Sequence, residues 1–291
     1  MVEDALGMFT EGLRQLGLDV NDPAGRERPF LQQFLRYRQE LLDWNTRMNL
    51  TAITDPGEVL IKHFLDSLSL LIVYDRPGTR LLDIGAGAGF PGLPLKIVRP
   101  DWQVVLLEAT AKKVTFLQHI IETLQLQDVI AVHGRAEELA HKQEYRAAFD
   151  LVTARAVAPL PTLLEYAAPF CRTGGQIILP KKGELSEELA QGERAARQLG
   201  AVLKADVVVT LPGLTDGRRL LVWEQQKPCP AQFPRSGAVI ARKPLGEASH
   251  VHSHRDRHPS SRPRRRDICI LAMGIGNSTP STRIHSRMPL A

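Results

Sequence analysis

Apolar residues recur at helical spacing over the first part of the chain. Leu31, Phe34 and Leu41 follow this spacing, and a similar pattern returns after Pro56. Because an α-helix has 3.6 residues per turn, this spacing places apolar side chains on one face of each helix. Residues 1–73 are therefore predicted to form a helical region that packs its apolar faces on the rest of the protein.

From residue 80 the pattern changes to short apolar runs that alternate with amphipathic segments. This alternation predicts an α/β fold with a mostly parallel seven-stranded sheet and helices on both faces. Only residues 212–219 separate the last two runs, which is too short for a helical crossover, so those two strands should pair antiparallel. The predicted strands are 80–84, 104–107, 129–132, 149–153, 176–179, 207–211 and 220–224, and the predicted helices lie near 91–99, 111–126, 136–143, 160–170 and 184–199.

The charge of the chain is concentrated at its C-terminal end. Residues 246–291 carry eight arginines against three acidic residues, so they account for the whole net charge of +5. They are rich in Ser, Pro, His and Arg and lack hydrophobic periodicity, which predicts a disordered basic tail. The expected organisation is a helical region at 1–73, an α/β domain at 74–245 and this tail. Nucleic-acid binding by the body must then depend on local basic patches.

Three features favour a cytoplasmic protein without a membrane span. No run of about 18 apolar residues is present. The N-terminus is acidic and lacks the basic and apolar regions of a signal peptide. Cys171, Cys229 and Cys269 are far apart and have no metal-binding spacing, so we expect reduced thiols and no metal site.

A glycine-rich segment follows the first predicted strand. Asp83 precedes Gly85, Gly87 and Gly89, which occupy every second position before a predicted helix. Glycine lets the backbone turn sharply and approach a ligand closely. The dinucleotide-binding spacing is G-x-G-x-x-G, whereas here Phe90 stands at the third glycine position. This spacing, with an acid before the loop, favours a ligand with a cationic or amino end, such as S-adenosylmethionine, over a diphosphate.

Three further strand ends carry polar residues that could meet such a ligand. Glu108 lies 23 residues after Gly85, a spacing that suits a carboxylate accepting both ribose hydroxyls of either NAD or S-adenosylmethionine. Glu137 could reach an adenine edge, or it could simply stabilise the first turn of a helix. Arg155 could contact a carboxylate, a phosphate or the substrate base, or it could form a local ion pair.

Other polar residues have weaker claims. His63 and Asp66 are three apart and could face the same way on a helix, although a lone histidine is more often structural. Lys113, Lys181 and Lys182 could hold phosphates around the mouth of the site, but surface lysines are usually only solvated. The segment 44–52 offers possible caps and a core tryptophan, and its residue types alone indicate no function.

Taken together, these segments resemble the RsmG (GidB) family of bacterial methyltransferases, which modify N7 of one guanosine in small-subunit ribosomal RNA. The resemblance covers about residues 41–245 and combines the generic glycine loop with more specific motifs. The matching segments are Trp44-Asn45 with Met48-Asn49-Leu50-Thr51-Ala52, His63-Phe64-Leu65-Asp66-Ser67-Leu68, Asp83-Ile84-Gly85 with Gly89-Phe90-Pro91-Gly92, Lys112-Lys113, Gly134-Arg135-Ala136-Glu137, Arg155-Ala156-Val157-Ala158-Pro159-Leu160 and Lys182-Gly183.

The resemblance implies a class I, Rossmann-like fold, S-adenosylmethionine as cofactor and 16S ribosomal RNA or the small subunit as partner, with the chain acting as a monomer. The family often has aspartate in place of Glu108, and residues 246–291 extend beyond the family pattern. The implied roles are a cofactor pocket lined by Gly85 and Phe90, ribose binding by Glu108, nucleoside contacts by Ala109 and Thr110, adenosine contacts by Ala136 and Glu137, and a place for Arg155 near the methionine end or the target base.

The implied reaction needs little from the protein as an acid or base. N7 of guanine has an in-plane lone pair and no proton, so it can attack a sulfonium methyl directly once the two are aligned. This agrees with the lack of an evident catalytic His or Cys. Two alternatives remain at this stage: a non-enzymatic RNA-binding assembly factor, and a nicotinamide-dependent oxidoreductase, which the loop spacing disfavours.

Overall fold

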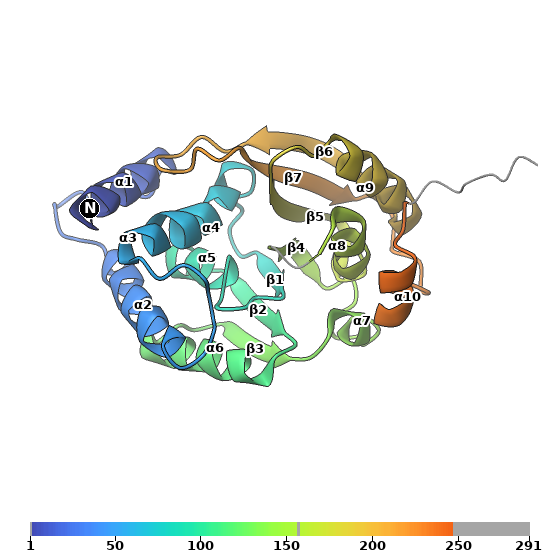
Figure 1. Cartoon of the computed structure of the whole chain (residues 1–291), viewed down its shortest axis with the longest axis horizontal. Coiled ribbons are helices and arrows are strands. Elements are labelled where there is room, and N and C mark those ends of the chain that lie inside the picture. The colour runs from blue at the N-terminus through green and yellow to red at the C-terminus, as the bar shows by residue number, and fades with distance from the viewer. Residues whose placement is uncertain (1, 156–157, 247–291) are drawn as a thin grey trace, which may run out of the picture. The chain divides into compact units, whose positions relative to one another are not determined.

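The computed structural model describes residues 2–155 and 158–246, which build a seven-stranded sheet with helices on both faces (Figure 1). The strand order is β3-β2-β1-β4-β5-β7-β6, and β7 runs opposite to the other six strands, so its pairings with β5 and β6 are antiparallel. The chain moves outward from β1 to β3 and then returns to the other side of β1, so a ligand crevice is expected between β1 and β4. The strands are β1 (Arg80–Ile84), β2 (Gln103–Glu108), β3 (Val129–His133), β4 (Phe149–Ala154), β5 (Cys171–Lys182), β6 (Ala201–Val208) and β7 (Arg218–Gln225).

The two faces of the sheet bury separate apolar clusters. In β1, Leu81 belongs to one cluster and Leu82 to the other, as the alternation of side chains along a strand requires. Helices α1, α2, α5 and α6 pack into the first cluster, and α7, α8 and α9 pack into the second (Figure 1). The helix bounds are α1 (Val2–Gln15), α2 (Pro29–Asn45), α5 (Gly92–Val98), α6 (Ala111–Thr123), α7 (Ala136–Leu139), α8 (Leu160–Ala167), α9 (Ser186–Leu199) and α10 (Gly237–Arg242).

A mixed helical stretch connects α2 to the sheet. It consists of α3 (Pro56–Glu58), a π-helical segment (Val59–Leu65), α4 (Asp66–Leu68) and a 3₁₀ segment (Ser69–Ile72). The Asp55 side chain caps its start by accepting hydrogen bonds from the backbone of Gly57 and Glu58. A π-helical turn is wider than an α-helical one and often occurs at functional sites. Here it carries His63, and Asp66 follows three residues later as the first residue of α4.

The predicted fold class and the antiparallel pairing of the last two strands are confirmed, but several predicted boundaries are wrong. The strand predicted at 176–179 is β5, Cys171–Lys182, which extends beyond the prediction at both ends, and the helices predicted at 111–126 and 160–170 each end three residues earlier. The strand predicted at 207–211 is β6, Ala201–Val208; it lies at the edge of the sheet, so most of its side chains are only partly buried and its apolar run marks its end. The helix predicted at 136–143 stops at Leu139. The disordered basic tail predicted for residues 246–291 lies, from residue 247 onward, outside the residues that the structure describes. Within the described ranges, no helix is long and apolar enough to cross a bilayer.

Candidate functional site

The glycine loop joins the end of β1 to α5 and curls over the end of β2. The backbone N–H groups of Gly85 and Ala86 both donate to the carbonyl of Leu107, at 2.7 and 3.1 Å. Gly89 adopts a φ of +97°, and a Cβ there would lie 2.5 Å from both Leu93 and the Tyr37 hydroxyl. The backbone conformation and the tight packing against α2 therefore both require glycine at this position.

Asp83 lies beneath this loop and does not line the ligand cavity, which differs from the sequence-based expectation. Its side chain is fully buried, and Oδ2 accepts a 2.8 Å hydrogen bond from the Gly92 backbone. Burial raises the pKa of Asp83 to about 7. The carboxyl group holds the start of α5 against β1, so its contribution to the site is to shape the loop.

Glu108 binds the loop from the end of β2. Its Oε2 accepts from the Gly87 backbone at 2.9 Å, and its Oε1 accepts from the Thr110 backbone at 2.8 Å. The residue is 6% exposed and lines a cavity of about 450 Å³. Because each carboxylate oxygen can accept more than one hydrogen bond, the fixed carboxylate can still bind hydroxyl groups of a ligand.

Five of the eight residues predicted for the cofactor site line this cavity. Thr110 adjoins it through its hydrogen bond to Glu108. Ala136 and Glu137 lie on α7 and are not part of the cavity wall among the described residues; the Glu137 carboxylate is 3.9 Å from the Arg135 guanidinium. The five residues on the wall are Gly85, Phe90, Glu108, Ala109 and Arg155.

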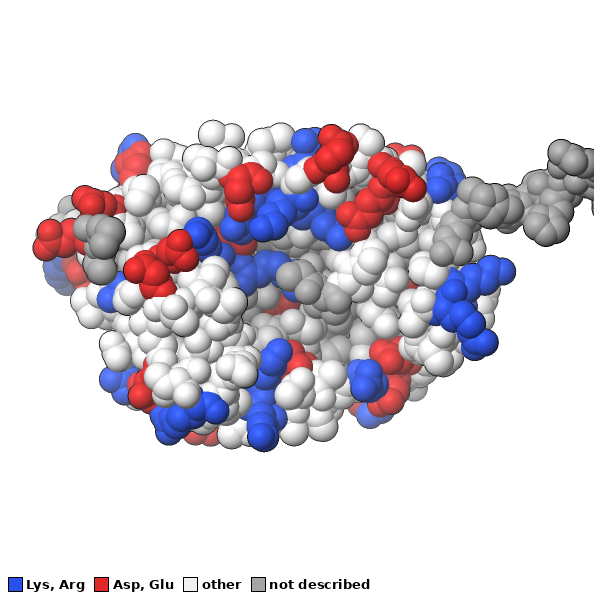
Figure 2. Space-filling model, viewed as in Figure 1, with Lys and Arg blue, Asp and Glu red and all other residues white. Residues whose placement is uncertain are grey.

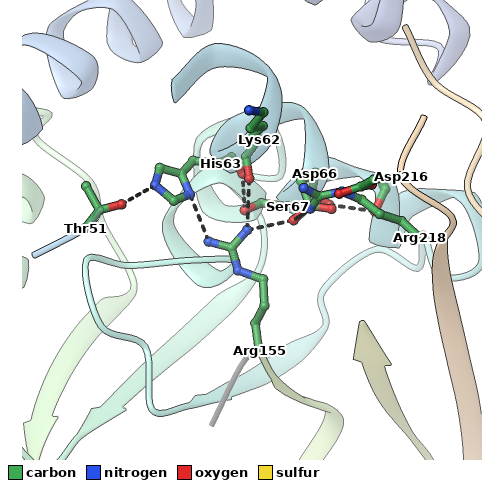
Figure 3. Close-up of polar contacts among 9 residues, drawn as sticks. Thr51, Lys62, His63, Asp66, Ser67, Arg155, Asp216 and Arg218 are labelled. Carbon is green, nitrogen blue, oxygen red and sulfur yellow. Dashed lines mark hydrogen bonds and ion pairs between the residues drawn. The ribbon is translucent and has the colours of Figure 1, made fainter. Parts of the chain in front are cut away.

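Arg155 lies just after the end of β4, and its guanidinium group contacts other members of a polar cluster on the wall of the cavity (Figure 3). Its Nη1 donates to Asp66 Oδ2 at 2.8 Å, and its Nη2 lies 3.3 Å from His63 Nδ1. Its guanidinium carbon is 5.1 Å from the centre of the Phe90 ring, which also stacks on His63 with 4.5 Å between centroids. Asp66 also pairs with Arg218, so one nearly buried carboxylate binds two guanidinium groups.

The contacts of His63 determine its tautomer. A guanidinium group can only donate, so Nδ1 must accept from Arg155, and Nε2 then carries the proton and donates to Thr51 Oγ1 at 2.7 Å. Burial, and then the charges of Arg155 and Arg218, lower the pKa of His63 to about 3. The imidazole is therefore neutral at physiological pH.

The segment after α2 positions Thr51, which also lines the cavity. Asn45 Oδ1 accepts from the backbones of Leu50 and Thr51 at 2.9 and 3.0 Å, and its Nδ2 donates to the Thr51 carbonyl at 3.0 Å. Sequence reasoning assigned no function to this segment. The asparagine side chain satisfies backbone groups that no helix or strand pairs, and it thereby fixes the loop beside His63.

Sequence reasoning also missed the roles of His63, Asp66 and Arg218. The spacing of His63 and Asp66 was the available signal, and both side chains do contact the Arg155 guanidinium. Of the lysines considered as phosphate contacts, Lys113 lines the cavity. Lys181 and Lys182 line a neighbouring groove instead.

Comparison with known proteins places the chain in a family. Residues 30–215 match the model of the GidB family, described as rRNA small subunit methyltransferase G. The chain is 46% identical over 234 residues to Ribosomal RNA small subunit methyltransferase G of Dehalococcoides mccartyi strain CBDB1, covering 80% of this chain and 97% of that protein. The protein of the same name from Lachnoclostridium phytofermentans is 44% identical over 238 residues, with 81% and 96% covered.

Among solved structures, precorrin-6Y C5,15-methyltransferase of Geobacter metallireducens aligns with a TM-score of 0.43 and 14% identity, covering 56% of this chain and 88% of that one. The family match extends over more than half of the chain, and the relatives align over nearly their whole length. The chain therefore belongs to the GidB family of ribosomal RNA small subunit methyltransferases.

Proposed function

We propose that this chain transfers a methyl group from S-adenosylmethionine to N7 of a guanosine in 16S ribosomal RNA. The observation that carries the proposal is the cavity between the glycine loop and Glu108, one wall of which is formed by Arg155 and His63. The names of its relatives supply the substrate: each is a ribosomal RNA small subunit methyltransferase. Residues 74–245 would form the methyltransferase domain with 1–73 packed on it, acting as a monomer in the bacterial cytoplasm.

The residues of the cavity fit the cofactor. A volume of about 450 Å³ lies within the usual range of small-molecule sites. At Gly87 an added Cβ would meet nothing closer than 3.8 Å, and because this glycine lines the cavity, the side chain would occupy ligand space. Glu108 would bind the ribose hydroxyls, with Gly85, Ala109 and Thr110 beside the nucleoside. The adenosine contacts of Ala136 and Glu137 remain predictions from the family resemblance.

When bound, S-adenosylmethionine supplies a sulfonium methyl group that the N7 lone pair of guanine can attack, leaving a neutral thioether and a positively charged base. No proton has to leave N7, so the protein needs no general base at this atom. The task of its residues is alignment. Phe90, held between His63 and Tyr37, provides a rigid wall, and the ion pair with Asp66 fixes the direction of Arg155. The neutral His63 adds no positive charge beside the methylated base.

The test combines cofactor binding with product mapping. Calorimetric titration with S-adenosylmethionine is compared for the wild type, Glu108→Ala and the control Glu122→Ala, an exposed acid on α6. Loss of the fixed carboxylate should weaken binding at least about tenfold, and the control should match the wild type. Labelled methyl transfer to small subunits and to naked 16S RNA should yield 7-methylguanosine in digested RNA. Unchanged affinity in Glu108→Ala, or a product without 7-methylguanosine, would contradict the proposal.

A further inference from the structure

A second groove adjoins the cofactor cavity. It has a volume of about 380 Å³, and His63 and Arg155 line both spaces. Its other walls come from the end of β5, the first turn of α9 and the start of β7, including Lys181, Glu188 and Leu220. Figure 2 shows basic side chains along the upper edge of a hollow in the middle of this face, with acidic side chains next to them. Because the two spaces share these residues, a nucleic-acid base bound in the groove would lie next to a ligand bound in the cofactor cavity.

The charges of the groove are largely neutralised within the protein. Six lysine and arginine side chains line it, and five of them already pair with a carboxylate. Pro180, Val209 and Leu220 add apolar surface. A site for a phosphate alone would leave cations free, whereas paired charges beside apolar surface favour a flat neutral group with polar edges. The paired cations are Lys62 with Glu58, Arg155 and Arg218 with Asp66, Lys181 with Glu188, and Arg219 with Asp206.

Glu188 is held in place while keeping one oxygen available. Its Oε1 accepts from the Leu160 backbone at 2.6 Å and from Lys181 Nζ at 2.7 Å. Its Oε2 has no hydrogen-bond partner within residues 2–155 and 158–246. Lys181 Nζ also donates to the Ala158 carbonyl at 3.4 Å, and no third acceptor for this ammonium group lies among the residues that the structure describes. The groove therefore presents a fixed acceptor next to a fixed donor.

This pair matches one edge of guanine. Along its rim, guanine has N7, then the O6 acceptor, then the N1–H and 2-amino donors. A carboxylate can accept from N1–H and the amino group, and an ammonium can donate to O6, which leaves N7 directed away from the carboxylate. Adenine has an acceptor at N1 and would face Glu188 with a repulsive contact.

We propose that Glu188 and Lys181 read the Watson–Crick edge of the target guanine and so orient N7 toward the cofactor cavity. The proposal rests on the methyltransferase function proposed above. Arg155 lines both the groove and the cofactor cavity, whereas Lys181 and Glu188 line the groove and are not among the residues that line the cavity. A guanine that binds Lys181 and Glu188 through its Watson–Crick edge can therefore turn N7, on its opposite side, toward Arg155 and the cavity. Glu188 and Lys181 are thus specificity-determining residues.

The test uses small subunits reconstituted with a 16S RNA that carries either guanosine or inosine at the target position. Inosine keeps N7, O6 and N1–H and lacks only the 2-amino group. The variant Glu188→Gln keeps an oxygen for Leu160 and Lys181 and replaces the free acceptor by a donor. The matched control is Glu187→Gln, the exposed neighbouring acid that does not line the groove.

The wild type should prefer guanosine over inosine roughly tenfold in kcat/KM, and Glu188→Gln should lose activity on guanosine roughly ten- to hundredfold together with this preference. The Glu188→Gln variant should bind S-adenosylmethionine with the same affinity as the wild type. The control Glu187→Gln should match the wild type in cofactor affinity, in activity and in its preference for guanosine. Full activity of Glu188→Gln, or reduced activity with an intact preference for guanosine, would overturn the inference. A wild type that forms no 7-methylguanosine would instead overturn the proposed function.

Discussion

The neutral state of His63 predicts a measurable loss of stability at acid pH. The ring is 8% exposed, its Nδ1 faces the Arg155 guanidinium, and Arg218 lies beyond it on Asp66. A proton on Nδ1 would break this hydrogen bond and place two cations in contact. Burial and these charges therefore lower the pKa of His63 in the folded protein from its ordinary value of 6.5 to about 3.

The magnitude follows from proton linkage. Between about pH 6.5 and pH 3 the unfolded chain binds a proton at His63 that the folded chain does not, so the contribution of His63 to stability is complete above pH 6.5 and is lost as the pH falls. Each pH unit in this range corresponds to about 1.4 kcal/mol. At pH 5, about 1.5 units below the unfolded-state value, the free energy of unfolding should therefore be lower by about 2 kcal/mol.

The assay is urea unfolding followed by circular dichroism at pH 7.5 and pH 5.0, for the wild type and His63→Asn. Asparagine can still accept from Arg155 through its side-chain oxygen but does not titrate. Asp83, whose pKa is raised to about 7, titrates in both proteins and cancels in the comparison. Between the two pH values the wild type should lose about 2 kcal/mol relative to the variant. Equal pH dependence in the two proteins would refute the neutral, buried assignment of His63.

Three substitutions test the surroundings of the site. Gly89→Ala should lower the free energy of unfolding by roughly 1–3 kcal/mol and weaken cofactor binding, because alanine disfavours the positive φ at this position and its Cβ would clash with Leu93 and Tyr37. An unchanged midpoint of urea unfolding would contradict this. Asn45→Ala removes three hydrogen bonds and should cost roughly 2 kcal/mol in thermal unfolding, with weaker cofactor binding; wild-type values for both would contradict the loop's role. Glu165→Ala leaves Arg235 without its bidentate partner and should cost roughly 2–3 kcal/mol and expose residues 226–246 to proteolysis; equal cleavage rates would oppose this.

Much of the architecture follows from local sequence patterns. The central strands β1 and β2 are mostly apolar and almost fully buried, and their ends lie within a residue of the prediction. The edge strand β6 was misplaced because its half-buried residues do not form a continuous apolar run. The glycine loop and Glu108 could also be predicted from the sequence. A backbone turn with positive φ favours glycine, and an acidic residue directly at the end of an apolar run marks a carboxylate at the end of a strand.

The polar cluster could not be derived in the same way. Arg155 meets Asp66 and His63 across 89 and 92 residues of chain, and Asp66 also meets Arg218 from β7. Asp83 looked like a ligand contact, but packing of α5 buries it beneath the loop. The sequence alone thus determined the order of elements, the glycine turn and the acid at the end of β2, because these depend on neighbours a few residues away. Only the tertiary structure decided which charges are paired, which histidine tautomer is present and which oxygen of Glu188 binds Leu160 and Lys181, because burial and electrostatic partners arise from segments that the fold brings together.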